Sequence, residues 1–267
     1  MPAQQKATVV MSYPDWVILH VPHDATAIPA DVRNQFVLDD EALAVEVVRM
    51  TDHLTLSIFA GAAESANIVR APVNRLVVDV ERFPDDDQEP MSKQGMGVIY
   101  TSTSHKAQLR RDLTAAERKA LLDRYYYPHH QHLENLVTEK LTHFGRCLIV
   151  DCHSFPMVAL PYEERDLSKL RPDICIGTDP FHTTVALAEA FEQSFRDAGW
   201  SVAVNDPFSG TLVPQSRYNQ DNRVQSVMVE LNRALYLHPD TDLPLSEFET
   251  FGSLIRECMA EAIAMAS

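Results

Sequence analysis

Short apolar runs alternate with longer amphipathic runs along most of the chain. The apolar runs are continuous, as in strands that are buried on both faces of a sheet. The amphipathic runs repeat apolar residues at the spacing of one helix face. This pattern predicts strands at 16–21, 75–81, 146–151, 173–177, 200–204 and 225–231. It predicts helices at 39–59, 114–144, 183–198 and 245–265.

Local signals refine several of these boundaries. Thr114 and Glu117 have the spacing of a capping box and mark a helix start. Pro128 is expected to interrupt the helical region at 114–144. Gly199 is expected to end the helix at 183–198. The acidic run at 85–87 lies between prolines and is expected to be a solvated loop.

The alternation of strands and helices predicts an α/β fold. We expect one domain over residues 1–267, with three layers and a mixed, mostly parallel sheet that carries helices on both faces. The least regular segments, 83–112, 154–172 and 205–224, each follow an expected strand. They should therefore gather at the carboxyl edge of the sheet, where α/β proteins place their sites.

Composition excludes several classes of partner. Lys and Arg total 23 against 38 Asp and Glu, which gives a formal net charge of −15. A charge of this sign argues against binding to nucleic acid or to an anionic membrane surface. The four cysteines form no CxxC pair, and the chain has neither a signal-like start nor an apolar run long enough to cross a membrane. We therefore expect a soluble, cytoplasmic protein.

Three polar residues stand where apolar strands end. His23 follows the first expected strand, His153 follows the third, and Glu230 lies inside the last. A carboxylate in such a strand costs several kcal/mol unless it is paired or bound to metal. Each residue alone has an ordinary explanation: a lone histidine is often structural, and Arg233 could pair with Glu230. Three such positions at one sheet edge favour a shared site.

A zinc site accounts for this group of residues. His23 and His153 supply two nitrogen ligands, and catalytic zinc commonly adds a carboxylate and keeps a position for water. Asp52 is the candidate carboxylate, although an exposed helical aspartate is the alternative, and Asp24 is a weaker candidate. Asp151 is placed to accept the second N–H of a ligand histidine. Other divalent metals accept the same ligands.

Six segments resemble the N-formylglutamate amidohydrolase family in order and spacing, over roughly residues 16–240. They are Pro22-His23, Thr51-Asp52, Val78-Asp79-Val80-Glu81-Arg82, Tyr127-Pro128-His129-His130, Asp151-Cys152-His153-Ser154 and Val229-Glu230-Leu231-Asn232-Arg233. The family is similar in fold to the zinc carboxypeptidases and aspartoacylases. The resemblance implies a single mixed sheet covered on both faces, a catalytic zinc ion, and hydrolysis of an amide next to a carboxylate.

The resemblance also implies a role for individual residues. His23, Asp52 and His153 would be the zinc ligands, and Glu230 the general base and acid. Arg82 would bind the substrate carboxylate, a task that suits the two-pronged guanidinium. A sixth residue, His130, matches a family histidine that contacts substrate or supports the site, and a structural role is equally consistent.

Two departures from the family pattern bear on the substrate. The usual small pair after Pro-His is Asp24-Ala25 here, and the usual Asn before the arginine is Glu81. An ionised glutamate would repel a substrate carboxylate that Asn would bind. We therefore expect a small anionic N-acyl amino acid, of which N-formylglutamate is one example. The alternatives are a zinc carboxypeptidase-like peptide hydrolase and a metal-free binding protein on the same scaffold.

Overall fold

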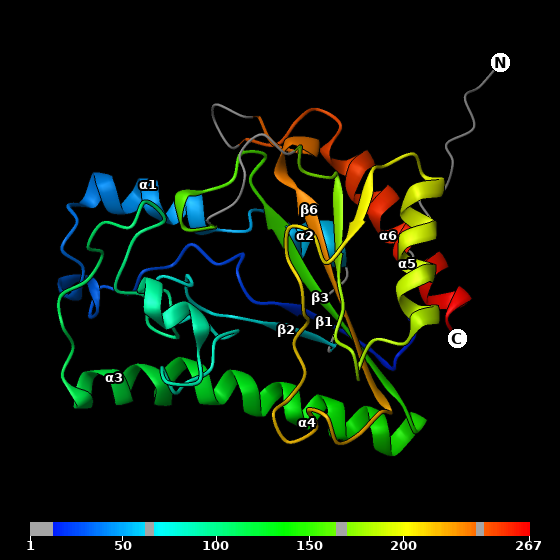
Figure 1. Ribbon diagram of the computed structural model, residues 1–267, viewed down its shortest axis with the longest axis horizontal. Coiled ribbons are helices and arrows are strands. Elements are labelled where there is room, and N and C mark those ends of the chain that lie inside the picture. Colours follow the sequence, from blue (N-terminus) through cyan, green and yellow to red (C-terminus); the bar gives the residue numbers. More distant parts are fainter. Residues whose placement is uncertain (1–12, 62–66, 164–169, 239–242) are drawn as a thin grey trace, which may run out of the picture.

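A twisted sheet of six strands forms the centre of the computed structural model (Figure 1). The structure describes residues 13–61, 67–163, 170–238 and 243–267, and the statements below concern these residues. The strands are β1 (Val17–Val21), β2 (Ile68–Arg70), β3 (Cys147–Phe155), β4 (Ile174–Gly177), β5 (Val202–Val204) and β6 (Val224–Asn232). Their order is β2-β1-β3-β6-β4-β5, and only the β4–β6 pair is antiparallel.

Helices cover both faces of this sheet (Figure 1). The described α-helices are α1 (Asp40–Met50), α2 (Thr55–Ala60), α3 (Ala115–Leu121), α4 (Tyr127–Phe144), α5 (Val185–Asp197) and α6 (Phe248–Met265). The helices α2, α5 and α6 pack on one face, and α4 packs on the other. The expected α/β class, with a mixed and mostly parallel sheet, is confirmed. None of the described helices is both long and apolar enough to cross a membrane.

The central strands are apolar on both faces for most of their length, as their sequences suggested. In β1, Leu19 faces α2 and α6 while Ile18 faces α4. In β3, Val150 likewise faces α2 and α6, and Ile149 faces α4. Because successive side chains of a strand alternate, polar residues near the carboxyl ends can be assigned to a face. His20, Asp151 and His153 continue the rows of Ile18 and Ile149, on the α4 face.

The expected strand at 75–81 is wrong. These residues form turns, and β2 lies earlier, at Ile68–Arg70. The Asn74 side chain accepts from Leu76 N, and its backbone carbonyl accepts from Val77 N. These bonds turn the chain away from the extended form, and its apolar side chains pack in a separate core cluster beside the sheet. A short buried run thus resembled a strand without being one.

The single helix expected at 39–59 is also wrong, because the chain breaks between α1 and α2. Thr51 Oγ1 donates to Val47 O, and Leu54 has a left-handed φ of 63°. The backbone N–H of Asp52 donates to His23 O at 2.9 Å. The break therefore turns Asp52 toward the end of β1, where His23 lies.

The helical region near Pro128 is continuous, contrary to the expected interruption. A π-helical segment, Leu122–Tyr126, joins α3 to α4, and Pro128 lies in the first turn of α4. Proline has no N–H to satisfy, and the wider π-helical turn just before Pro128 accommodates it without a break. The capping box of Thr114 and Glu117 is confirmed at the start of α3.

Candidate metal centre and active site

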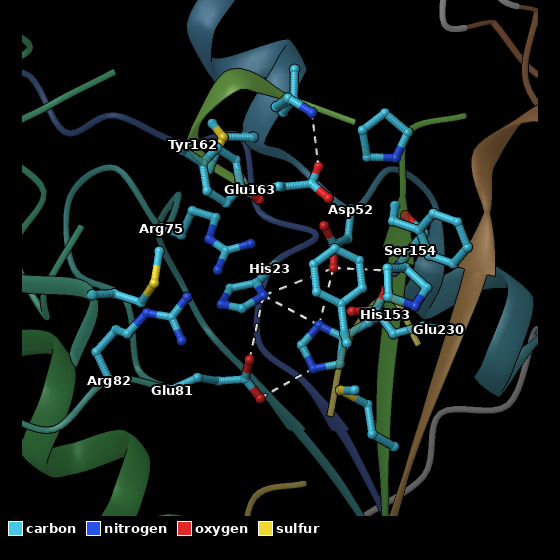
Figure 2. A pocket seen from close by; sticks show the side chains of 18 of the residues that line it. His23, Asp52, Arg75, Glu81, Arg82, His153, Ser154, Tyr162, Glu163 and Glu230 are labelled. Atoms are coloured by element: carbon cyan, nitrogen blue, oxygen red, sulfur yellow. Dashed lines mark hydrogen bonds and ion pairs between the residues drawn. The ribbon is translucent and has the colours of Figure 1, made fainter. Parts of the chain in front are cut away.

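The candidate site lies at the carboxyl ends of β1, β3 and β6, where the loops converge (Figure 2). It opens on a cavity of about 690 Å³. His23, Asp52, His153, Glu230 and Arg82 all line this cavity. The structure thus brings together five of the six residues that the sequence singled out.

Three of these residues present ligand atoms to one another. The atoms Nδ1 of His23, Nδ1 of His153 and a carboxylate oxygen of Asp52 come from three separate elements of the fold, and such atoms lie within 4.8 Å of one another. The two Nδ1 atoms are 3.3 Å apart, and His153 Nδ1 is 3.1 Å from Asp52 Oδ2. All three side chains are buried. Two imidazoles and a carboxylate form a donor set that divalent transition metals accept.

The opposite nitrogen of each ring faces a carboxylate. His23 Nε2 lies 2.9 Å from Asp79 Oδ1, and His153 Nε2 lies 3.1 Å from both Asp151 Oδ1 and Glu81 Oε1. A carboxylate accepts only, so a neutral ring with its proton on Nε2 satisfies these outer contacts, and His153 Nδ1 then faces Asp52 Oδ2 without a proton. In a neutral ring Nδ1 then carries a lone pair.

This arrangement fits a bound cation. With both rings neutral, the two Nδ1 lone pairs and Asp52 Oδ2 point at one another with no proton between them. Burial and nearby Arg75 lower the pKa of His23, which keeps that ring neutral. Burial also disfavours charge on His153, but Glu81 and Asp151 outweigh it and raise its pKa well above the usual range. The pocket around His153 therefore favours positive charge, as a metal or a proton.

Asp52 is held by more than the candidate ligands. Arg233 Nη2 donates to its Oδ1 at 3.0 Å, and Ser154 N donates to its Oδ2 at 3.2 Å. Burial would raise the pKa of this carboxyl, but His153 and Arg233 hold it well below its ordinary value. Arg233 pairs with Asp52 and has no ion pair with Glu230 among the described residues. The sequence had offered that ion pair as the ordinary explanation for Glu230.

Glu230 lies next to His153 because β3 and β6 pair in parallel with these two residues in register. Its carboxylate is buried, and its Oε2 has no hydrogen-bond partner within the described structure. Burial raises the pKa of Glu230 to about 8, with Asp52 adding to the rise and His153 opposing it. A carboxyl group with this pKa can hold or release a proton near neutral pH.

Arg82 and Arg75 enter the cavity from the segment that replaces the expected strand (Figure 2). Arg75 donates to Asp79 Oδ2 at 2.9 Å, whereas Arg82 approaches the same oxygen only to 3.8 Å. Arg82 Nε is buried without a hydrogen-bond partner in the described structure. The sequence did not point to Arg75, since its place in the cavity depends on the turn at Asn74.

Asp79 connects several of these groups. It contacts His23 and Arg75 through side-chain bonds, and Tyr100 Oη donates to its Oδ2 at 2.7 Å. It also accepts from the backbone N–H of Glu81. Burial would raise its pKa, but Arg75, His23 and Arg82 hold the pKa well below the usual range.

His130 lies outside the cavity lining, behind the segment that carries Arg82. Its Nε2 donates to Val80 O at 2.8 Å, and its ring packs on Tyr126 with centroids 4.2 Å apart. The hydroxyl of Tyr126 donates to Arg82 O. Together these contacts fix the backbone on both sides of Glu81.

The two family departures have different surroundings. Asp24 pairs with Arg70 at 2.7 Å and takes no part in the candidate metal clusters. Glu81 lines the cavity, with Oε2 at 3.6 Å from His23 Nδ1. Glu81 therefore adds negative charge beside the candidate ligands.

Comparison with known proteins places this geometry in context. Residues 16–237 match the model of the N-formylglutamate amidohydrolase family. No curated protein sequence matches the chain significantly. Four chains of known structure match significantly, among them two that share the fold over most of this chain. An N-formylglutamate amidohydrolase from Ralstonia eutropha JMP134 has a TM-score of 0.81 and 22% identity, with 95% of each chain covered.

The second is a gene product from Agrobacterium tumefaciens, with a TM-score of 0.63 and 21% identity over 93% of this chain and 90% of that one. At these sequence identities, the structural similarity shows a shared fold and nothing more. The family match covers most of the chain, including every candidate site residue. The chain belongs to the N-formylglutamate amidohydrolase family.

Proposed function

We propose that this protein is a metal-dependent amidohydrolase that cleaves the amide bond of an N-formyl or N-acyl amino acid, such as N-formylglutamate. One observation carries this proposal: the convergence of two imidazole nitrogens and a carboxylate oxygen beside the buried carboxyl of Glu230. Membership of an amidohydrolase family supports it.

His23, Asp52 and His153 would hold the metal, with zinc as the expected ion. The chemistry that such an ion supplies when bound is activation of water and polarisation of the amide carbonyl. The protein fixes the ligand rings through Asp79 and Asp151, which accept from their outer N–H groups. Outer carboxylates of this kind orient ligand histidines and raise their basicity.

Glu230 would move the proton during hydrolysis. It would take a proton from the attacking water at its carboxylate and return it to the leaving amine. Its place beside His153 and its pKa of about 8 support this role. A base and acid with a pKa close to the working pH serves both steps.

Arg82 would bind the substrate carboxylate at the other end of the cavity. Its guanidinium is free of close hydrogen bonds within the described residues, while Arg75 next to it is already paired with Asp79. Fixing the carboxylate would hold the amide in place for attack.

Purified protein should contain about one zinc ion per chain and hydrolyse N-formyl-L-glutamate. Chelation followed by dialysis should abolish the activity, and added zinc should restore it. Comparing N-formyl and N-acetyl amino acids with dipeptides separates this proposal from a carboxypeptidase-like enzyme. Full activity in metal-free protein, or turnover of dipeptides alone, would contradict the proposal.

A further inference from the structure

A row of buried polar side chains extends away from His153 on the α4 face of the sheet. His20 Nδ1 lies 2.7 Å from Asp151 Oδ1, the same oxygen that faces His153 Nε2. His20 Nε2 lies 2.9 Å from His129 Nε2, which belongs to α4. The result is an unbroken series of contacts from His153 through Asp151 and His20 to His129.

These residues lie in a setting where apolar side chains would be expected. His20 is completely buried, and Asp151 and His129 are nearly so. The residues that precede them on the same strand faces, Ile18 and Ile149, are part of the apolar cluster under α4. Placing imidazoles and a carboxylate here costs free energy unless each finds a partner. Each of them finds a partner within the series, and Asp151 also accepts from the backbone N–H of Leu212.

We propose that His20 and His129 are positioning residues that fix Asp151 and, through it, hold the Nδ1 of His153 toward the metal. This inference rests on the metal site proposed above. Neither histidine lines the cavity, so neither is placed to touch the substrate.

The hydrogen-bond directions are consistent along the whole series. Asp151 accepts from His153 Nε2–H and from His20 Nδ1–H at one oxygen, and from Leu212 N–H at the other. With Nδ1 protonated, a neutral His20 ring presents a lone pair at Nε2, which accepts from His129 Nε2–H. Burial and the neighbouring His20 lower the pKa of His129 to about 2, so that ring is neutral.

The geometry makes the position of Asp151 depend on His20. Without His20, Oδ1 would keep only its contact with His153 Nε2, and Oδ2 its bond from Leu212 N. Glu81, which also faces His153 Nε2, is partly exposed and lies 3.7 Å from His20 Nδ1. Without His20, Asp151 and Glu81 could share the His153 N–H in several ways, and Nδ1 would be less well directed.

The test measures zinc affinity by competition with a fluorescent chelator at one pH. The variants are His20→Leu, which removes both contacts, and His20→Asn, whose amide nitrogen can replace Nδ1–H. We expect a zinc dissociation constant about tenfold higher for His20→Leu, which lies in the range for outer contacts of metal ligands. His20→Asn should stay close to the parent, and His129→Leu should show a smaller increase than His20→Leu.

His182→Asn is the matched control for loss of a buried histidine. His182 donates from Nδ1 to Val224 O and accepts from Asn219 N, at the end of β6 remote from Glu230. It should lower thermal stability and leave zinc affinity unchanged. If His20→Leu also leaves zinc affinity unchanged, or if His20→Asn is as weak as His20→Leu, the proposal is wrong.

Two further results would overturn the proposal. Two zinc ions per parent chain, one of them lost in His20→Leu, would make His20 a ligand instead of a positioning residue. If the parent protein binds no zinc, the proposed metal site is wrong as well. If the parent binds zinc and the variants bind it with the same affinity, only this inference is wrong. His129→Leu keeps the contact between His20 and Asp151, so it tests the series even if the His20 variants fold poorly.

Discussion

The backbone N–H of Asp52 donates to the backbone carbonyl of His23 at 2.9 Å. Two of the three candidate metal ligands are thus tied through the main chain, independently of their side chains. The bond forms where α1 ends and closes the break before α2. The carboxylate of Asp52 is consequently in place before any ion binds, held by Arg233 as well.

Replacing Asp52 with alanine should remove the metal and destabilise the protein. The variant loses one ligand and leaves the buried guanidinium of Arg233 without its carboxylate, which costs roughly 2 to 4 kcal/mol. Elemental analysis and urea unfolding measure the two effects. Asp24→Ala serves as the control, because it breaks only the pair with Arg70 and should keep full zinc content. Full zinc content in Asp52→Ala would show that Asp52 is not a ligand.

The Glu230→Gln variant should keep its metal and lose catalysis. The amide cannot take a proton from water, and general acid–base groups contribute roughly 10²- to 10⁴-fold to rate. We expect a fall in kcat of that size, with KM changed little, in steady-state assays with N-formyl-L-glutamate. A variant as fast as the parent would assign proton transfer to another group.

The same substitution should stabilise metal-free protein, increasingly so at higher pH. The pKa of Glu230 rises from 4.5 to about 8 on folding. The unfolded chain therefore releases this proton first, and the folded parent loses stability as the pH rises between these two values. Glutamine has no such loss. Urea unfolding at pH 5, 6.5 and 8 should show a gain that grows with pH to several kcal/mol, since each unit of pKa shift corresponds to about 1.4 kcal/mol. A gain that is independent of pH would contradict the burial of an ionisable Glu230.

Substitution of Arg82 should weaken substrate binding more than turnover. Lysine keeps the charge but loses the two-pronged geometry, so Arg82→Lys should raise KM, and Arg82→Ala should raise it further. The lost charge-assisted bonds correspond to roughly 10- to 100-fold in kcat/KM. Arg124→Ala is the control, since it removes an exposed pair with Asp31. An unchanged KM in Arg82→Ala would show that the substrate carboxylate binds at another residue, and Arg75 would be the next candidate.

The sequence pattern predicted the sheet well because long buried strands leave a strong signal. It missed β2, which has three residues, and mistook 75–81 for a strand because burial beside the sheet and burial within it produce the same apolar run. The break after Met50 was also missed, since its cause is a bond from Asp52 to the distant His23.

The candidate site was predictable to a similar degree. His23, His153 and Glu230 stood out because polar residues at the ends of apolar strands are unusual. Asp52 was named as the candidate carboxylate from the helical pattern, where an exposed aspartate was the alternative, and the family resemblance supported it. The roles of Arg75 and His20 could not be predicted, since both depend on contacts between segments that are far apart in the sequence.

Asp79 contacts residues at both ends of this pocket. One carboxylate supports His23 at the metal end and Arg75 at the substrate end, with Arg82 close to the same oxygen. In the proposed site, a substrate anion bound to the arginines would change the electrostatic field at His23, and an ion bound to His23 would change the field at the arginines. If the proposed site is right, metal affinity and substrate affinity should therefore be thermodynamically linked through Asp79, and double-mutant cycles between the two ends should be non-additive.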